Sequence, residues 1–237
     1  MLWIAFAAFP LYLFGIFRGL FLYGGLCCQV VYLVSRGVSM GRLPLVGPHD
    51  TLIITAASVA AFAIPFQGGL RGYPQFTQGS AALAAALTAF ALVAGPQSTP
   101  LPPVLKVIWF ELHVILAFFS YALFGLAAVL GVQYMRNRDS LLEGYQYRAV
   151  LLGYCLFSLS MIFGGIWAYL AWGTYWLWTP KELWTSILWL FYSLYLHARL
   201  RPSWSGRPAA VLGIAGFGVV MFTYLGVSLL MKSSHTF

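Results

Sequence analysis

The sequence WAYLAWGTYWLWTPKELWTSILW spans Trp167–Trp189 and contains six of the nine tryptophans in this 237-residue chain. Indole combines a large apolar face with one N–H donor, so tryptophan favours the boundary between hydrocarbon and water. Its flat ring can also stack on a planar ligand. From composition alone, an aromatic belt that anchors a helix at a membrane surface is favoured over a ligand site.

The same stretch contains a helix-start signal. Thr179 is suited to the N-cap, Pro180 to the first helical position, and Glu182 to closing a capping box. We therefore expect an aromatic surface loop followed by a capped, apolar helix. Lys181 lies within this signal, where it could meet an anionic group or remain an ordinary solvated interfacial lysine.

Composition predicts an integral membrane protein. The chain is 61% hydrophobic and 8% charged, whereas soluble domains have about a quarter charged residues. Basic residues outnumber acidic ones by 13 to 5. In a membrane protein this excess indicates inner-facing loops and lipid headgroups rather than nucleic acid. The cysteines, Cys27, Cys28 and Cys155, lie in apolar runs and form neither a metal spacing nor a CxxC motif.

Eight apolar runs predict an all-α, polytopic helical bundle. We expect eight transmembrane helices, with six as the lower limit because the first two runs are marginal in length. The runs cover residues 2–17, 19–35, 51–66, 80–95, 107–134, 149–170, 183–198 and 209–231, and the predicted connections include residues 36–50, 68–80, 95–103 and 136–148. We expect a single membrane domain over residues 1–237, with an external Trp-rich loop at residues 166–185.

The distribution of Lys and Arg between alternate loops sets the expected orientation. One side holds Arg18, Arg71, Arg136, Arg138, Arg148, Arg199, Arg201 and Arg207, eight in all, and the other holds Arg36, Arg42, Lys106, Lys181 and Lys232, five in all. Because positive charge favours the inner face, this difference predicts that the Trp-rich loop lies outside.

Three of the four histidines are candidate iron ligands. His113 begins one predicted span and His235 follows the end of another, both on the side of the Trp-rich loop. Two neutral imidazoles beside a wall of aromatic rings suit a bis-histidine haem site. His197 lies thirteen residues beyond Trp184, about 20 Å deeper at roughly 1.5 Å per residue. It therefore indicates a second site or a pathway, or else an interfacial histidine that ends a helix.

The fourth histidine precedes a span, in the sequence Gly47-Pro48-His49-Asp50. We interpret Asp50 as a helix cap and His49 as a polar loop residue.

The run GGIWAYLAWGTYWLWTPKELWTSILWLFYSLYLHAR, Gly164–Arg199, resembles the cytochrome c assembly family with its tryptophan-rich WWD domain. Within that family it is most similar to the haem-handling subunit of system II cytochrome c synthases (CcsA type). WFELHVILAFFSYA, GVSLLMKSSH, YLHAR and GRLPLVGPHDTL extend the resemblance over most of the chain.

The resemblance implies the functional residues. His113 and His235 would be the external haem ligands and His197 the membrane-embedded histidine, with iron held only as haem. Thr179, Pro180, Lys181 and Glu182 would support the loop. The aromatic residues implied to stack on haem b are Trp167, Trp172, Trp176, Trp178 and Trp184.

The resemblance also implies a function and partners. The chain would handle haem, transport it and present it to the CxxCH segment of apocytochrome c for covalent attachment. A second synthase subunit with a large external domain would accompany it. The expected location is a bacterial inner membrane, with the Trp-rich loop on the periplasmic face; a thylakoid membrane would also fit.

Two departures from the family pattern keep alternatives open. Thr179 replaces the aspartate of the family's WDPKE, and Arg42 replaces a frequent histidine. The second predicted span has no histidine, so His197 has no obvious companion within this chain, and a partner subunit could supply one. The alternatives are a non-catalytic regulatory or scaffold protein linked to haem, and a haem carrier that delivers to a separate chaperone.

Overall fold

The computed structural model describes residues 2–97 and 100–227, in which eight α-helices and no β-strand are present. All eight predicted apolar runs form helices, which confirms the all-α, polytopic membrane fold. The chain divides into two compact units, residues 1–101 and 102–237, each described by itself below.

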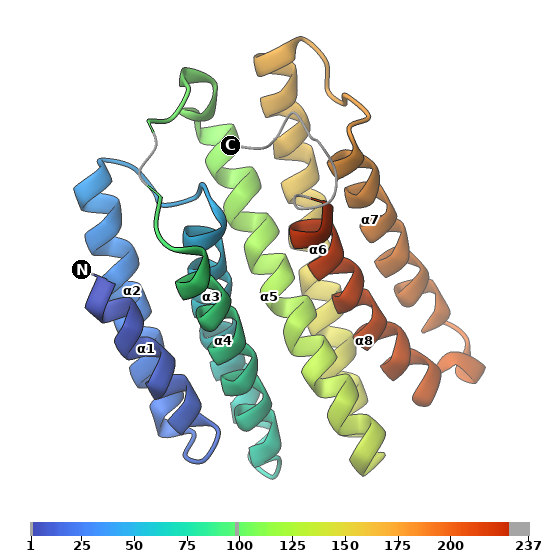
Figure 1. Cartoon of the computed structure of the whole chain (residues 1–237). Helices are drawn as coiled ribbons and strands as arrows, with labels where there is room; N and C mark the ends of the chain where they lie inside the picture. Colours follow the sequence, from blue (N-terminus) through green and yellow to red (C-terminus); the bar gives the residue numbers. More distant parts are fainter. Residues whose placement is uncertain (1, 98–99, 228–237) are drawn as a thin grey trace. The chain divides into compact units, whose positions relative to one another are not determined.

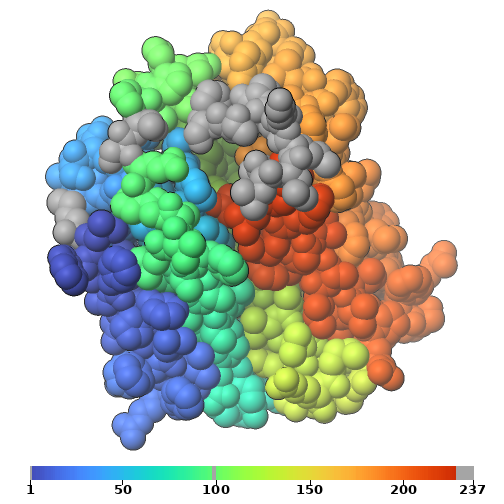
Figure 2. Space-filling model, viewed as in Figure 1, coloured from blue at the N-terminus to red at the C-terminus, as the bar shows by residue number. Residues whose placement is uncertain are grey.

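Unit 1 is a four-helix bundle in which consecutive helices run in opposite directions (Figure 1). Its helices are α1 (Leu2–Gly15), α2 (Leu20–Met40), α3 (Pro48–Gly69) and α4 (Pro74–Ala94). Each helix packs against its neighbours in sequence, and α1 also packs against α4, so the bundle closes. Figure 2 shows the side chains of α1 and α4 in contact along one face.

A hydrogen-bonded trio of side chains joins three helices inside unit 1. The Tyr12 hydroxyl of α1 donates to Gln29 Oε1 of α2 over 2.7 Å, and Gln29 Nε2 donates to Thr88 Oγ1 of α4 over 2.8 Å. All three side chains are buried. Gly25 permits the tyrosine to lie there, because a Cβ at this position would be 2.5 Å from the Tyr12 ring.

Unit 2 contains the other four helices, α5 (Ile108–Asn137), α6 (Ser140–Trp172), α7 (Pro180–Ala198) and α8 (Arg207–Met221). Short 3₁₀ turns, η1 (Pro103–Leu105) and η2 (Pro202–Trp204), precede α5 and α8, and a π-helical turn, η3 (Phe222–Gly226), continues α8. Both α6 and α8 pack against α5, and α7 packs against α6 and α8.

Several helices extend into segments predicted as loops. The charged segment 136–148 is not a long loop, because α6 already begins at Ser140. Arg138 takes a left-handed conformation (φ 55°), and the Asp139 side chain caps α6 by accepting the Leu141 N–H over 2.8 Å. Similarly, the connection predicted over residues 68–80 is only the four residues between Gly69 and Pro74, because Pro74 begins α4 at a position where proline is favourable.

Six of the helices in the described part of the chain are long and apolar enough to cross a membrane: α2, α3, α4, α5, α6 and α8 with its π turn. The 14-residue α1 is apolar but shorter. The protein is therefore an integral membrane protein. The number of helices that could span the membrane equals the lower limit of six expected from the sequence.

Replacement of Gln29 by alanine tests the trio in unit 1. The change leaves the buried Tyr12 hydroxyl without its acceptor, and we expect a loss of about 1–2 kcal/mol. Thermal unfolding in detergent measures it, with Val30→Ala as the control because Val30 lies on the same helix and is 47% exposed. Equal stability of the two variants would contradict the role of the trio.

Candidate functional site

The Trp-rich loop of unit 2 joins α6 to α7 and has an unusual backbone. Gly173 ends α6 in the left-handed conformation (φ 75°), which glycine adopts readily. Trp178 has φ 59° although it is not glycine, a conformation that costs roughly 1–2 kcal/mol for a residue with a side chain. Its indole is 69% exposed. The loop therefore holds a large apolar ring at the surface in a strained conformation.

The predicted capping box stabilises this loop. Thr179 is the N-cap of α7, and its Oγ1 accepts the Glu182 N–H over 3.3 Å. Glu182 Oε2 accepts the backbone N–H groups on both sides of Trp178, from Leu177 at 3.0 Å and from Thr179 at 2.9 Å. One carboxylate therefore closes the helix start and also fixes the strained residue. The predicted roles of Thr179, Pro180 and Glu182 at the helix start are confirmed.

The tryptophans proposed to stack on haem occupy different environments. Trp167 is buried, with its Nε1–H donating to the Val104 carbonyl over 2.8 Å, and it contacts Trp172 edge-to-face at 4.8 Å between ring centroids. Trp176 is half-buried in the loop. Trp184 packs edge-to-face against Phe222 at 4.5 Å, which brings α7 next to the π turn that follows α8. The most exposed of the five is Trp178.

His113 lies next to this aromatic group. Its Nδ1 is 2.9 Å from the Ser160 carbonyl oxygen of α6, and its ring lies nearly parallel to that of Trp167, with 6.3 Å between centroids and an interplanar angle of 16°. Because α5 and α6 are antiparallel, His113 near the start of α5 lies beside the end of α6, from which the loop emerges. The structure thus places His113 beside Trp167 of the Trp-rich stretch. The predicted loop at residues 166–185 is shorter than expected, because α6 continues to Trp172 and α7 begins at Pro180.

His197 lies at the other end of α7. The helix is continuous from Pro180 to Ala198, so the expected axial separation from Trp184 holds. The imidazole is exposed, and its Nδ1 is 2.8 Å from the carbonyl oxygen of Ser193 one turn earlier. Nearby, Glu143 pairs with Arg199 and accepts the Gly206 N–H over 2.6 Å, which ties α6 to the connection between α7 and α8. The remaining predicted ligand, His235, lies outside the described residues.

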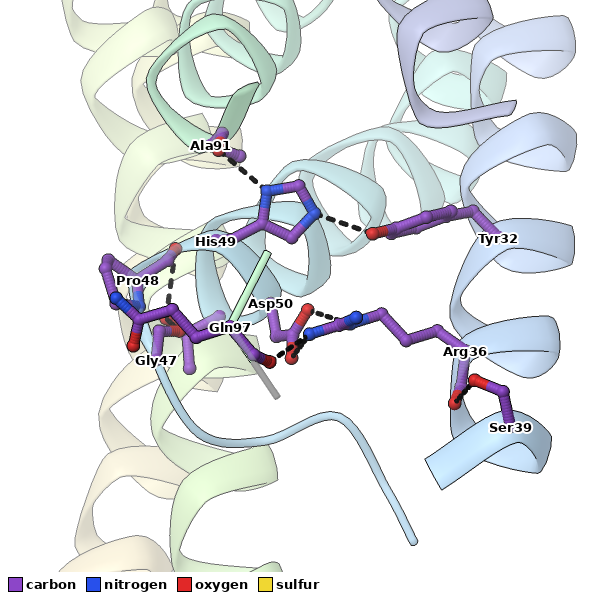
Figure 3. A network of polar contacts seen from close by, with 10 residues as sticks. Tyr32, Arg36, Ser39, Gly47, Pro48, His49, Asp50, Ala91 and Gln97 are labelled. Carbon is purple, nitrogen blue, oxygen red and sulfur yellow. Dashed lines mark hydrogen bonds and ion pairs between the residues drawn. The ribbon is translucent and has the colours of Figure 1, made fainter. Parts of the chain in front are cut away.

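His49 and Asp50 belong to a polar network in unit 1 (Figure 3). The two ring nitrogens of His49 are each 2.7 Å from a partner, the Tyr32 hydroxyl and the Ala91 carbonyl. Arg36 binds both oxygens of Asp50, at 2.5 and 3.0 Å, and donates to the Gln97 carbonyl at 2.6 Å. The network connects α2, α3, α4 and the segment after α4.

The predictions for this segment were wrong in two respects. His49 is not in a loop, because α3 begins at Pro48. Asp50 is not the helix cap, because the N-cap is Gly47, which makes no side-chain capping bond. The Asp50 carboxylate pairs instead with Arg36, because leaving a buried charge unpaired costs more free energy than leaving a helix end without a side-chain cap.

Two residues that contact His113, Ser160 and Gly164, were not identified from the sequence as site residues. The available signal was the Gly164-Gly165 pair inside an apolar helix, because glycine within a helix usually has a packing reason. Among the described residues there is no group of three or more His, Cys, Asp or Glu side chains that could hold a metal ion. What the arrangement offers an iron is an imidazole beside flat aromatic rings.

Replacement of Thr179 tests the cap. Thr179→Ala removes the acceptor for the Glu182 N–H and is expected to cost about 1 kcal/mol. Thr179→Asp keeps an acceptor for the Glu182 N–H, so its loss of stability is expected to be smaller than that of Thr179→Ala. Some loss remains, because aspartate cannot donate to the Glu182 carboxylate as the threonine hydroxyl does at 3.2 Å. Thermal midpoints followed by tryptophan fluorescence measure both, and an alanine variant as stable as the wild type would contradict the capping role.

Comparison with known proteins identifies the family. A family model described as cytochrome C assembly protein matches residues 49–235. The cytochrome c biogenesis protein CcsA of Thermosynechococcus vestitus is 30% identical, in an alignment that covers 89% of this chain and 83% of the relative. The CcsA protein of Chlorella vulgaris is 30% identical, with 93% and 86% covered, and that of Synechococcus elongatus is 29% identical, with 89% and 83% covered. The chain belongs to the cytochrome c assembly protein family.

Proposed function

We propose that this protein handles haem during cytochrome c maturation and presents it on the outer face of the membrane for covalent attachment to apocytochrome c. The observation that supports this most directly is the position of His113 beside Trp167, at the end of α6 from which the Trp-rich loop emerges. The names of the CcsA relatives, cytochrome c biogenesis proteins, support the same pathway.

In this proposal His113 and His235 are the axial ligands of the iron. Neutral imidazole is a good ligand for haem iron, and a bis-histidine pair can be displaced one ligand at a time. Trp172, Trp176, Trp178 and Trp184 provide faces for the macrocycle, and Trp178, the most exposed, is well placed for an entering ligand. Trp167 serves best as the support beneath His113, since it is buried and its N–H is hydrogen-bonded to Val104.

His197 is proposed to contact haem at a second site or along its route. Its exposure on α7 suits a ligand that shares the iron with a group from a partner subunit. Lys181, in the first turn of α7, is proposed to meet a haem propionate, because a lysine ammonium attracts carboxylates.

The chemistry implied for the substrates is redox-neutral. Each cysteine thiol of the CxxCH segment adds across one vinyl group of haem b, with a carbon–sulfur bond formed and the thiol hydrogen transferred to the other vinyl carbon. Haem b is proposed because it carries the two vinyl groups that this addition consumes. The protein would orient the haem and control its iron ligand, which favours the geometry in which the thiols can react. The histidine of CxxCH would then displace one axial ligand and help release the product.

The proposed location is an energy-transducing membrane, the bacterial inner membrane, with the Trp-rich loop on the periplasmic side. In unit 2, six arginines lie toward the end opposite the loop: Arg136, Arg138, Arg148, Arg199, Arg201 and Arg207. The described residues at the loop end include two lysines, Lys106 and Lys181. This difference supports an inward position for the arginine-rich end. A second synthase subunit with a large external domain is the proposed partner.

A second candidate is a haem carrier or a haem-linked regulator without synthase activity, suggested by Thr179 where the family has aspartate. Because Thr179 performs the capping function, the helix start does not require the aspartate. The candidates differ in one respect: a synthase subunit forms thioether bonds, and a carrier or regulator does not.

The test is cytochrome c maturation in a bacterial host that lacks its own maturation system and co-expresses this chain, a candidate external-domain subunit and a reporter cytochrome. We expect covalent haem on the reporter with the wild type and at least a tenfold loss with His113→Ala, because one axial ligand is removed. His49→Ala is the matched control, since that histidine lies in the unit 1 network.

Full activity of a His113→Ala/His235→Ala variant would contradict the proposed ligation. Haem bound to the wild-type chain without any covalent product would favour the carrier or the regulator.

A further inference from the structure

The side of the His113 ring that faces α6 is held by three residues of that helix. The Ser160 carbonyl oxygen is 2.9 Å from Nδ1, and the Ser160 hydroxyl lies 3.1 Å from the same nitrogen while donating to the His113 carbonyl at 2.7 Å. Gly164 lies directly against the ring, and Trp167 is nearly parallel to it. Positions 160, 164 and 167 share one face of α6, as the helical repeat requires.

The contact with Ser160 determines which ring nitrogen carries the proton. A carbonyl oxygen can only accept a hydrogen bond, so the hydrogen lies on Nδ1 and the bond is Nδ1–H to Ser160 O. In the neutral imidazole the lone pair is then on Nε2. A hydrogen bond from the second nitrogen is also how proteins usually orient a metal-ligating histidine and raise its basicity.

Gly164 is what allows this contact. A Cβ added at Gly164 would lie 2.6 Å from His113 Nδ1, 2.9 Å from Cε1 and 3.2 Å from Cγ. Contacts this short cannot persist, so a methyl group would displace the ring from the Ser160 carbonyl. At the adjacent Gly165 the nearest atom to an added Cβ, the Tyr175 carbonyl oxygen, is 3.7 Å away. The chain thus has two neighbouring glycines, of which one is sterically required and the other is not.

We infer that Ser160 and Gly164 are positioning residues of the haem site, which fix the tautomer and the rotation of the His113 imidazole so that Nε2 is the ligating nitrogen. This inference rests on the proposed function, in which His113 is an axial ligand. Ser160 acts through its backbone carbonyl and hydroxyl, and Gly164 acts through the absence of a side chain. Neither residue touches the iron.

The inference separates two effects of a Gly164→Ala change. Alanine is a better helix former than glycine by about 1 kcal/mol, so α6 itself is not weakened. The displaced imidazole, however, loses its Nδ1–H hydrogen bond and its alignment, and second-shell losses of this kind lower metal affinity by about 10–100-fold.

The experiment is a haem titration of the full-length protein purified in detergent, with the low-spin absorption spectrum recorded for each variant. We expect a 10–100-fold higher dissociation constant and a reduced low-spin fraction for Gly164→Ala, and wild-type behaviour for Gly165→Ala. His113→Ala is the reference for complete loss of the ligand. Ser160→Ala keeps the carbonyl but loses the hydroxyl, so a smaller loss in the same direction is expected.

The outcomes distinguish the two levels of the proposal. Wild-type titration and spectrum for Gly164→Ala, together with an impaired His113→Ala, would overturn the positioning role and leave the ligand role intact. Wild-type behaviour of His113→Ala itself would overturn the proposed function. If Gly164→Ala does not fold, as judged by circular dichroism, Ser160→Ala decides, and unchanged haem affinity in that variant would contradict the inference.

Discussion

Each polar group inside this protein must find its partner within the protein, because the hydrocarbon around a membrane helix offers none. The helices satisfy the backbone, and several buried side chains are paired in the same way, although the buried Tyr192 and Tyr195 hydroxyls have no hydrogen-bond partner among the described residues. Gln29 bridges Tyr12 and Thr88 in unit 1, while Arg36 binds Asp50 there, and in unit 2 Glu143 binds Arg199. Two of these contacts, Gln29–Thr88 and Glu143–Arg199, join segments 59 and 56 residues apart in the sequence, so they help specify which helices pack together as well as satisfying polar atoms.

A second constraint is the space that such pairs need, and glycine provides it. An added Cβ would collide with Tyr12 at Gly25, with Gln146 at Gly131, with His113 at Gly164 and with Tyr192 at Gly216. In each case a small residue on one helix accommodates a polar or aromatic side chain from another. Close helix approach through small residues is common in membrane proteins. The contact between His113 and α6 is therefore built in the same way as the structural contacts elsewhere in the chain.

The fold class and the helix start after the Trp-rich loop could be predicted from the sequence, because both depend on local patterns. Apolar runs define the helices, and Thr179, Pro180 and Glu182 form a capping signal within four residues. Helix ends at charged segments were less predictable, since Asp139 caps α6 immediately after α5 ends. The partner of Asp50 lies fourteen residues away on another helix, so no local pattern indicated that it would pair rather than cap.

The candidate site could be predicted only in part, because only some of its residues are recognisable from local sequence patterns. His113 and the tryptophans stand out by residue type, and the resemblance to a family connected them. Ser160 and Gly164 do not stand out, because their contacts with the His113 ring form only when α5 packs against α6. The strained conformation of Trp178 was likewise not predicted from the sequence. It is held by hydrogen bonds from the Leu177 and Thr179 N–H groups to the Glu182 carboxylate, which form only when the loop is folded.

The central claim is that His113 ligates haem iron through Nε2. Pulsed electron paramagnetic resonance on haem-loaded protein with ¹⁵N-labelled histidine tests it most directly, because it detects the nitrogens bound to the iron. The account predicts labelled histidine nitrogens coupled to the iron in the wild type, and loss of one of these couplings in His113→Ala. Identical couplings in the two proteins would contradict the account.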